Sequence, residues 1–182
     1  MAGMILLVAA TLFSCKKTSY EPEQATTDAG SGPIGGKVDP PGGCAPTEVA
    51  LIAGQNINAG TVTVTNDANF IYVTYATTNG WTISQTHLYV GDCALIPVNH
   101  AGNPQPGHFP YTGTHSNVTS YTYQVPISAI PEGDCGCIAA HCVVNKSGPG
   151  GGTQTAWGNG SQINVGGSWA MKFDFCSCVA GS

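Results

Sequence analysis

The sequence predicts an all-β domain, an antiparallel β-sandwich of Ig-like or jelly-roll-like type with about seven or more strands. Short segments of this 182-residue chain alternate apolar and polar residues, and clusters of Gly, Asn, Asp and Pro separate them. No long stretch keeps the i, i+3, i+4, i+7 apolar pattern of an amphipathic helix. Short strands without intervening helices favour two packed antiparallel sheets, and a small barrel is the alternative.

The chain begins with a short apolar segment that ends at a cysteine. Residues 4–13 are largely apolar, and Leu12, Phe13 and Ser14 precede Cys15. This pattern resembles the lipobox of bacterial lipoproteins, in which the cysteine is acylated and becomes the first mature residue. The resemblance implies a signal peptide over residues 1–14, a membrane anchor through lipid on Cys15, and an extracytoplasmic location at the outer membrane or cell surface. About ten apolar residues are too few for a transmembrane helix, which needs ~20.

Residues 15–43 are predicted to form a disordered tether. Gly, Pro, Ser, Thr and acidic residues dominate this segment, and its branched aliphatic residues are Ile34 and Val38. Such a composition cannot bury enough apolar surface to fold. A flexible chain of this length spans roughly 30 Å. We therefore expect the tether to hold the folded domain, residues 44–182, away from the membrane surface.

The expected strands of the domain follow one another closely along the chain. They lie at residues 47–53, 60–65, 70–77, 81–90, 121–127, 133–145 and 169–178. Residues 66–69, Asn-Asp-Ala-Asn, tolerate a tight turn and predict a hairpin between the second and third strands. Asn79 and Gly80 give a second turn signal before the fourth strand.

The last two strands carry paired cysteines. Side chains two residues apart on a strand share a face, so each pair should lie on one side of its strand. The less apolar face of the first strand holds Cys135, Cys137 and His141, and that of the second holds Lys172, Asp174, Cys176 and Cys178. Trp169 should lie on the opposite, apolar face of the second strand, in the core.

Antiparallel neighbours lie within disulfide distance of one another, and an exported protein meets an oxidising environment. The strand faces on which the cysteines lie predict three disulfides: Cys135–Cys178, Cys137–Cys176 and Cys44–Cys93. This pairing leaves Cys142, on the apolar face, as a buried unpaired thiol. A four-cysteine zinc site is the alternative, although a C-x-C spacing differs from the usual zinc knuckle.

Two long irregular segments interrupt the strand pattern at residues 96–119 and 147–167. Long loops in compact domains are often functional, so we expect a ligand site there. The candidate ligand-binding residues are Trp157, Tyr111 and His108, because aromatic faces stack on sugars and on partner proteins. The alternative is that these aromatic residues pin the loops onto the domain.

Three histidines, His87, His115 and His141, could form a metal or catalytic site if they converge. The alternative is that the strand histidines lie half-buried and hydrogen-bond to the backbone. The sequence holds no G-x-S-x-G, H-E-x-x-H or calcium-loop motif, so no catalytic residues and no cofactor are predicted.

The charge composition excludes one class of partner. Charged residues make up 8% of the chain, all five basic residues are lysines, and only Lys146 and Lys172 follow residue 43. Nucleic-acid binding requires clustered Lys and Arg, so we expect no nucleic-acid partner.

Several runs resemble an uncharacterised domain of secreted and surface proteins from bacteria and some microbial eukaryotes: LIAGQNINAGTVTV, GWTISQTHLYVG, GNPQPGHFPYTGTH, IAAHCVV, TAWGNG and SWAMKFDF. The resemblance implies an extracellular β-domain without an assigned activity. Together with the lipobox, it favours a surface or periplasmic lipoprotein with a non-enzymatic binding or adhesion module for a glycan or protein ligand. The alternatives are a metal-dependent enzyme that uses the three histidines, or a structural surface or matrix component.

Overall fold

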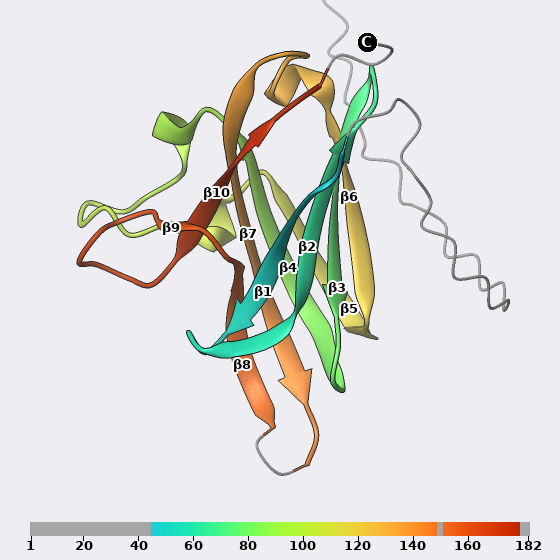
Figure 1. The fold of residues 1–182 in the computed structure, drawn as a ribbon. Helices are drawn as coiled ribbons and strands as arrows, with labels where there is room; N and C mark the ends of the chain where they lie inside the picture. Colours follow the sequence, from blue (N-terminus) through green and yellow to red (C-terminus); the bar gives the residue numbers. More distant parts are fainter. Residues whose placement is uncertain (1–44, 149–150, 179–182) are drawn as a thin grey trace, which may run out of the picture. The chain divides into compact units, whose positions relative to one another are not determined.

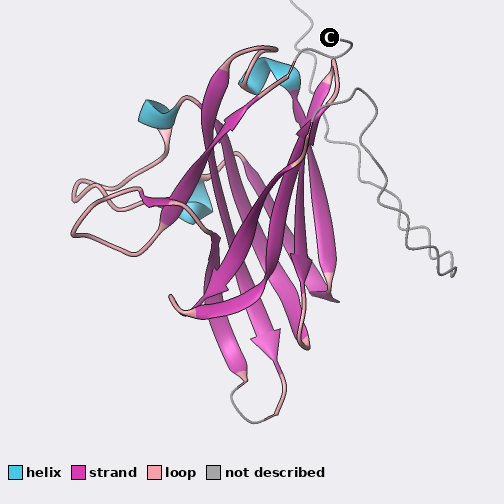
Figure 2. Cartoon of the chain, viewed as in Figure 1, coloured by secondary structure: helices cyan, strands magenta, loops and turns pink. Residues whose placement is uncertain are grey.

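The computed structural model describes residues 45–148 and 151–178, which form an all-β domain (Figure 1). Within these residues there is no α-helix, and three short 3₁₀ turns interrupt the strands (Figure 2). The strands are β1 (Thr47–Ala53), β2 (Ile57–Asn66), β3 (Phe70–Thr77), β4 (Trp81–Gly91), β5 (Tyr111–Val118), β6 (Ser120–Pro126), β7 (Cys135–Lys146), β8 (Gly152–Gly158), β9 (Ser161–Gln162) and β10 (Met171–Cys176). The turns are η1 (Cys93–Leu95), η2 (Pro106–His108) and η3 (Ile127–Ala129).

The ten strands belong to one antiparallel sheet. Its order is β5-β4-β7-β8-β1-β2-β3-β6, and β10 pairs with β7 and with the short β9 outside this path. The end strands β5 and β6 approach each other through side chains, with the rings of His115 and Tyr121 at 4.2 Å and those of Tyr111 and Tyr123 at 6.0 Å. The sheet is therefore nearly closed into a barrel, the alternative that the sequence offered, and the predicted sandwich type is not confirmed.

All seven strands expected from the sequence are present, and β1 and β3 have the predicted bounds. The predicted turn at residues 66–69 is confirmed, because the Asp67 carboxylate accepts hydrogen bonds from the backbone N–H groups of Asn69 and Phe70. Strands β5, β8 and β9 were missed. All three lie inside the segments predicted to be long loops, where Gly and polar residues obscure the alternation.

The principal core fills the inside of the curved sheet. It includes Tyr75, Leu88, Ile138 and Phe173, all buried. A β-bulge between Ile83 and Gln85 of β4 shifts the alternation by one residue, so that Thr86 and Leu88 point inward after it. As a result Gln85 and His87 lie on the outer face of β4.

A second apolar cluster lies between the outer face of the sheet and two loops. It contains Tyr89, Phe109, Cys137 and Trp157, with Trp169 packed at its edge. We call the two loops, residues 92–110 and 159–170, the loop layer; they lie side by side in Figure 1. The prediction that Trp169 lies on a strand in the core was wrong, because β10 starts at Met171 and Trp169, on the second loop, packs against the outer apolar cluster.

One disulfide ties this layer to β7 and another joins β7 to β10, but neither has the predicted pairing. Cys135 bonds to Cys176 and Cys93 bonds to Cys137. The three predicted pairings Cys135–Cys178, Cys137–Cys176 and Cys44–Cys93 were therefore wrong, and so was the zinc alternative. Cys178 takes part in a disulfide as well.

The physical reason for this correction is the strand register. Phe173 and Phe175 of β10 insert into the core, and this places Cys176 opposite Cys135 and Asp174 opposite Cys137. The predicted faces were right, since Cys137 lies in the outer cluster and Cys142 in the core. Cys142 is the free, buried cysteine of the described residues, as predicted.

The predicted signal peptide, Cys15, the tether and Cys44 lie outside the described residues. Within residues 45–148 and 151–178, no helix is long and apolar enough to cross a membrane.

Candidate functional site

His87 and His141 form a pair on the outer face of the sheet. They are direct partners in the β4–β7 ladder, and their Nδ1 atoms lie 3.1 Å apart, within hydrogen-bond distance. The Trp157 ring on β8 packs against His141, with ring centroids at 4.7 Å. The pair therefore lies where three neighbouring strands meet under the loop layer.

Burial holds both imidazoles in the neutral form. Burial, with the nearby His87 as a second cause, lowers the pKa of His141 to about 3, and burial also lowers the pKa of His87. A neutral pair needs one proton between the two Nδ1 atoms, so one ring donates and the other accepts. His141 is 7% exposed, whereas His87 reaches the surface.

A polar hollow of about 340 Å³ lies beside this pair. It is lined by Gln85, His87, Gly107, Thr112, Gly113 and Thr114. Thr112 and Thr114 are the β5 register partners of His87 and Gln85, so their side chains rise together from adjacent strands. The hollow offers hydroxyl, amide and imidazole groups and no carboxylate, which suits hydrogen bonding to a polar group.

His115 lies on the other side of the sheet from this pair. Its Nε2 is 2.8 Å from Thr86 Oγ1, and the same hydroxyl is 2.7 Å from the phenol oxygen of Tyr123. Burial lowers the pKa of His115 as well. Because Thr86 and His87 are consecutive on a strand, their side chains point to opposite faces. The three histidines therefore do not converge on one site.

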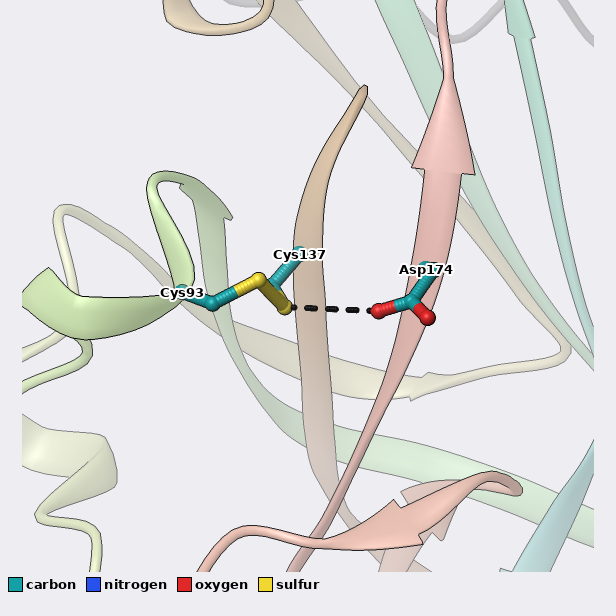
Figure 3. A group of neighbouring side chains, drawn as sticks. All are labelled: Cys93, Cys137 and Asp174. Atoms are coloured by element: carbon teal, nitrogen blue, oxygen red, sulfur yellow. Dashed lines mark hydrogen bonds between the residues drawn. A yellow bond between two sulfur atoms is a disulfide. The ribbon is translucent and has the colours of Figure 1, made fainter.

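His115 consequently cannot serve as a third metal ligand beside His87 and His141. Among the described residues, one group of three His, Cys, Asp or Glu side chains brings its ligating atoms within 4.8 Å of one another, and it contains no histidine. That group is Cys93, Cys137 and Asp174 (Figure 3). Both of its sulfurs are joined in a disulfide, so neither is a thiolate that could bind a metal.

The aromatic candidates occupy structural positions. Trp157 is 5% exposed; its ring packs edge-on against Phe109 and at a tilt against His141. Tyr111 is half-buried and packs against the core beside Tyr123. These contacts agree with the alternative in which aromatic residues pin the loops. His108, on η2, is exposed.

The loop layer itself is held rigid by polar contacts between its two segments. The side chain of Asn164 donates hydrogen bonds to the Ala101 carbonyl at 2.8 Å and to the Asn103 side chain at 3.1 Å. The Asn103 side chain also accepts a hydrogen bond from the backbone N–H of Ser168 at 2.8 Å. The Cys93–Cys137 disulfide ties the first loop to β7.

Three of the four exposed large apolar residues in the described part of the chain lie on this layer: Leu95 (69% exposed), Val98 (44%) and Val165 (87%). The fourth is Ile57, at the start of β2. Leu95, Val98 and Val165 were not among the predicted site residues, although aliphatic residues within polar, Pro-rich and Gly-rich segments were a usable signal.

Comparison of the chain with protein-family models, with curated proteins and with solved structures finds no match.

Proposed function

We propose that this protein is a lipid-anchored extracytoplasmic lipoprotein whose β-domain binds a protein ligand, without catalysis, through the loop layer. The observation that carries the proposal is that Leu95, Val98 and Val165 are exposed on two loops that are fixed to each other and to the sheet. A single exposed aliphatic residue needs no explanation. Apolar residues gathered on a rigid surface lose little conformational entropy on binding, which favours association.

The chemistry of the loop layer indicates the kind of ligand. Within residues 92–110 and 159–170, the sequence holds one charged residue, Asp92, among Asn, Gln, Ser, Pro and Gly. Depletion of charge together with exposed apolar side chains is typical of the centre of a protein interface. A glycan would need an open aromatic face, and Trp157 is buried. We therefore favour a protein ligand with an uncharged, apolar contact surface.

The location rests on two independent supports. The Leu-Phe-Ser-Cys segment supports acylation of Cys15. The disulfides are compatible with an extracytoplasmic compartment, because cytosolic reductants keep most thiols reduced. A tether between the lipid and the domain would leave the loop layer free to meet a ligand.

Photo-crosslinking of the full chain in its own cells tests the binding surface. A photoreactive amino acid is placed at Leu95, Val98 or Val165, and at Ile57 as the matched exposed control. We expect an adduct of defined mass from the loop positions and none from Ile57, and the adduct should be digested by protease. Equal adducts from all four positions, or none, would contradict the proposed surface; an adduct that resists protease but yields to glycosidases would make the ligand a glycan.

A further inference from the structure

The two cysteines of the Cys93–Cys137 disulfide differ in their exposure to solvent. Cys137 is 0% exposed, whereas Cys93 is exposed at the start of η1. A thiol from solution can therefore approach the sulfur of Cys93 and not that of Cys137. In thiol–disulfide exchange the attacked sulfur forms the new bond and the other sulfur leaves as a thiolate. Cys137 is thus the leaving group.

A cation contacts this leaving group. The Lys172 ammonium lies 3.2 Å from Cys137 Sγ, and the Lys172 side chain is only 23% exposed. Lys172 is one of two lysines in the described residues, the other being Lys146. An ammonium in contact with a sulfur stabilises the thiolate more strongly than the disulfide, because only the thiolate carries full negative charge. The contact therefore favours departure of Cys137.

Asp174 opposes this effect. Its Oδ1 lies 3.6 Å from Cys137 Sγ (Figure 3) and 3.9 Å from the Lys172 ammonium. Since a disulfide sulfur carries no proton, the 3.6 Å approach is an electrostatic contact in the oxidised protein. The Asp174 side chain is 80% exposed, so water and salt screen its charge more than that of Lys172. The cation should dominate.

The exposed end of the bond faces an open space. A hollow of about 350 Å³ is lined by Asp92, Cys93, Asp134, Cys135 and residues 129–131, with Gly91 and Gly136. This space admits a small thiol or the tip of a protein thiol beside Cys93. Its two carboxylates, Asp92 and Asp134, repel an anionic thiol and attract a cationic one.

We propose that the Cys93–Cys137 bond is a thiol-exchange site that accepts neutral or cationic thiols. The incoming thiolate attacks Cys93 Sγ, the Cys93–Cys137 bond breaks, and its electron pair leaves on Cys137 Sγ beside the Lys172 ammonium. A second thiol of the same class then attacks the mixed disulfide and releases the Cys93 thiolate. Two thiols are oxidised to one disulfide while the protein disulfide is reduced to two thiols.

Surface exposure alone would predict that the Cys135–Cys176 bond reacts more readily than the Cys93–Cys137 bond. In the Cys135–Cys176 disulfide both cysteines are exposed, and Cys135 lines the same hollow. If access decided reactivity, this bond would exchange first. The Cys135–Cys176 bond is therefore an internal reference within the same molecule.

The test treats the full-length protein with a thiol, stops the reaction with acid at timed intervals, alkylates it and maps the labelled peptides by mass spectrometry. We expect Lys172→Gln to slow opening of Cys93–Cys137 by about 3- to 10-fold, Asp174→Asn to accelerate it, and Lys172→Arg to keep it near the wild-type rate. Lys146→Gln, far from the bond, is the control. In every variant the Cys135–Cys176 rate should stay unchanged.

The second part of the test compares thiols of different charge. At equal thiolate concentration, cysteamine should open the Cys93–Cys137 bond faster than mercaptoethanesulfonate. The mixed disulfide should form on Cys93. Asp134→Asn should reduce the difference in rate between the two thiols. An unchanged rate in Lys172→Gln, an equal slowing of both disulfides, or a mixed disulfide on Cys137 would each overturn the proposal. Equal slowing of both bonds would assign Lys172 a general effect on β10 instead.

Discussion

At the scale of single residues, His141 shows how burial decides a charge. Its ring lies between His87 and Trp157, and its pKa of about 3 keeps it neutral at physiological pH. In the unfolded chain the histidine has an ordinary pKa near 6.5, so between that pH and about pH 3 the unfolded chain binds a proton at this position and the folded chain does not. The folded state is therefore penalised as the pH falls below about 6.5.

We predict that the free energy of unfolding decreases by up to about 1.4 kcal/mol for each pH unit between pH 6 and pH 4 because of His141. Urea unfolding at a series of pH values measures this slope. His141→Gln should flatten the slope over that interval. A slope that persists in His141→Gln would show that other groups cause it.

Position 60 accommodates only glycine. Its φ is +153°, and a Cβ at this position would lie 1.9 Å from the carbonyl oxygen of Ala76 on the neighbouring strand β3. The neighbour is backbone and cannot move aside. We predict that Gly60→Ala lowers the free energy of unfolding by at least about 2 kcal/mol.

Gly107→Ala provides the matched control for Gly60→Ala, because a Cβ at Gly107 would have no atom within 4 Å. Chemical denaturation of the two variants measures the difference. Equal stability of both variants would mean that the sheet relaxes at Gly60 more readily than a paired backbone should.

At the scale of elements, β8 is the strand whose position the sequence conceals. It lies between β1 and β7 near the middle of the sheet, although it follows a Gly-rich run and only its last three residues are buried. Its partner on one side is β7, the strand that precedes it in the chain, and its partner on the other is β1, where Ile52 is distant in sequence. The strand forms because both neighbours present free backbone groups, and local propensity contributes little.

Trp157 on β8 gives the prediction at this scale. Because its ring fills the space between Phe109 and His141, Trp157→Ala should lower the free energy of unfolding by about 3–5 kcal/mol. Val165→Ala, at an exposed position of the loop layer, should change it by less than about 0.5 kcal/mol. Thermal or urea unfolding measures both. A stable Trp157→Ala variant that loses ligand binding would restore the tryptophan as a binding residue.

Alternation was sufficient to predict the strands and their faces wherever apolar residues line one side. It placed Cys142 in the core and Cys137 outside it, and both placements are confirmed. It could not choose between Cys176 and Cys178 as the residue opposite Cys135, because positions two apart on a strand are equivalent to a local pattern. Packing of Phe173 and Phe175 in the core makes that choice.

At the scale of the whole molecule, the lipobox prediction concerns residues outside the described part of the chain. Cys15→Ala should prevent lipidation and release the protein from the membrane fraction, or leave the precursor uncleaved, because stable anchoring of a lipoprotein depends on its acyl chains. Fractionation and intact-mass measurement distinguish these results. Lys16→Gln, one residue further, should remain in the membrane fraction. Unchanged membrane attachment and unchanged processing of Cys15→Ala would refute the lipoprotein assignment.

The sequence by itself determined the all-β class, seven of the strands, the hairpin turn between β2 and β3, and the buried free thiol. These follow from local alternation, turn chemistry and composition, which act over a few residues. Only the tertiary structure decided the disulfide partners, the separation of His115 from the His87–His141 pair, and the contact of Lys172 with Cys137. Each of these depends on strand order, register and one β-bulge, which packing of distant residues sets and a local pattern does not record.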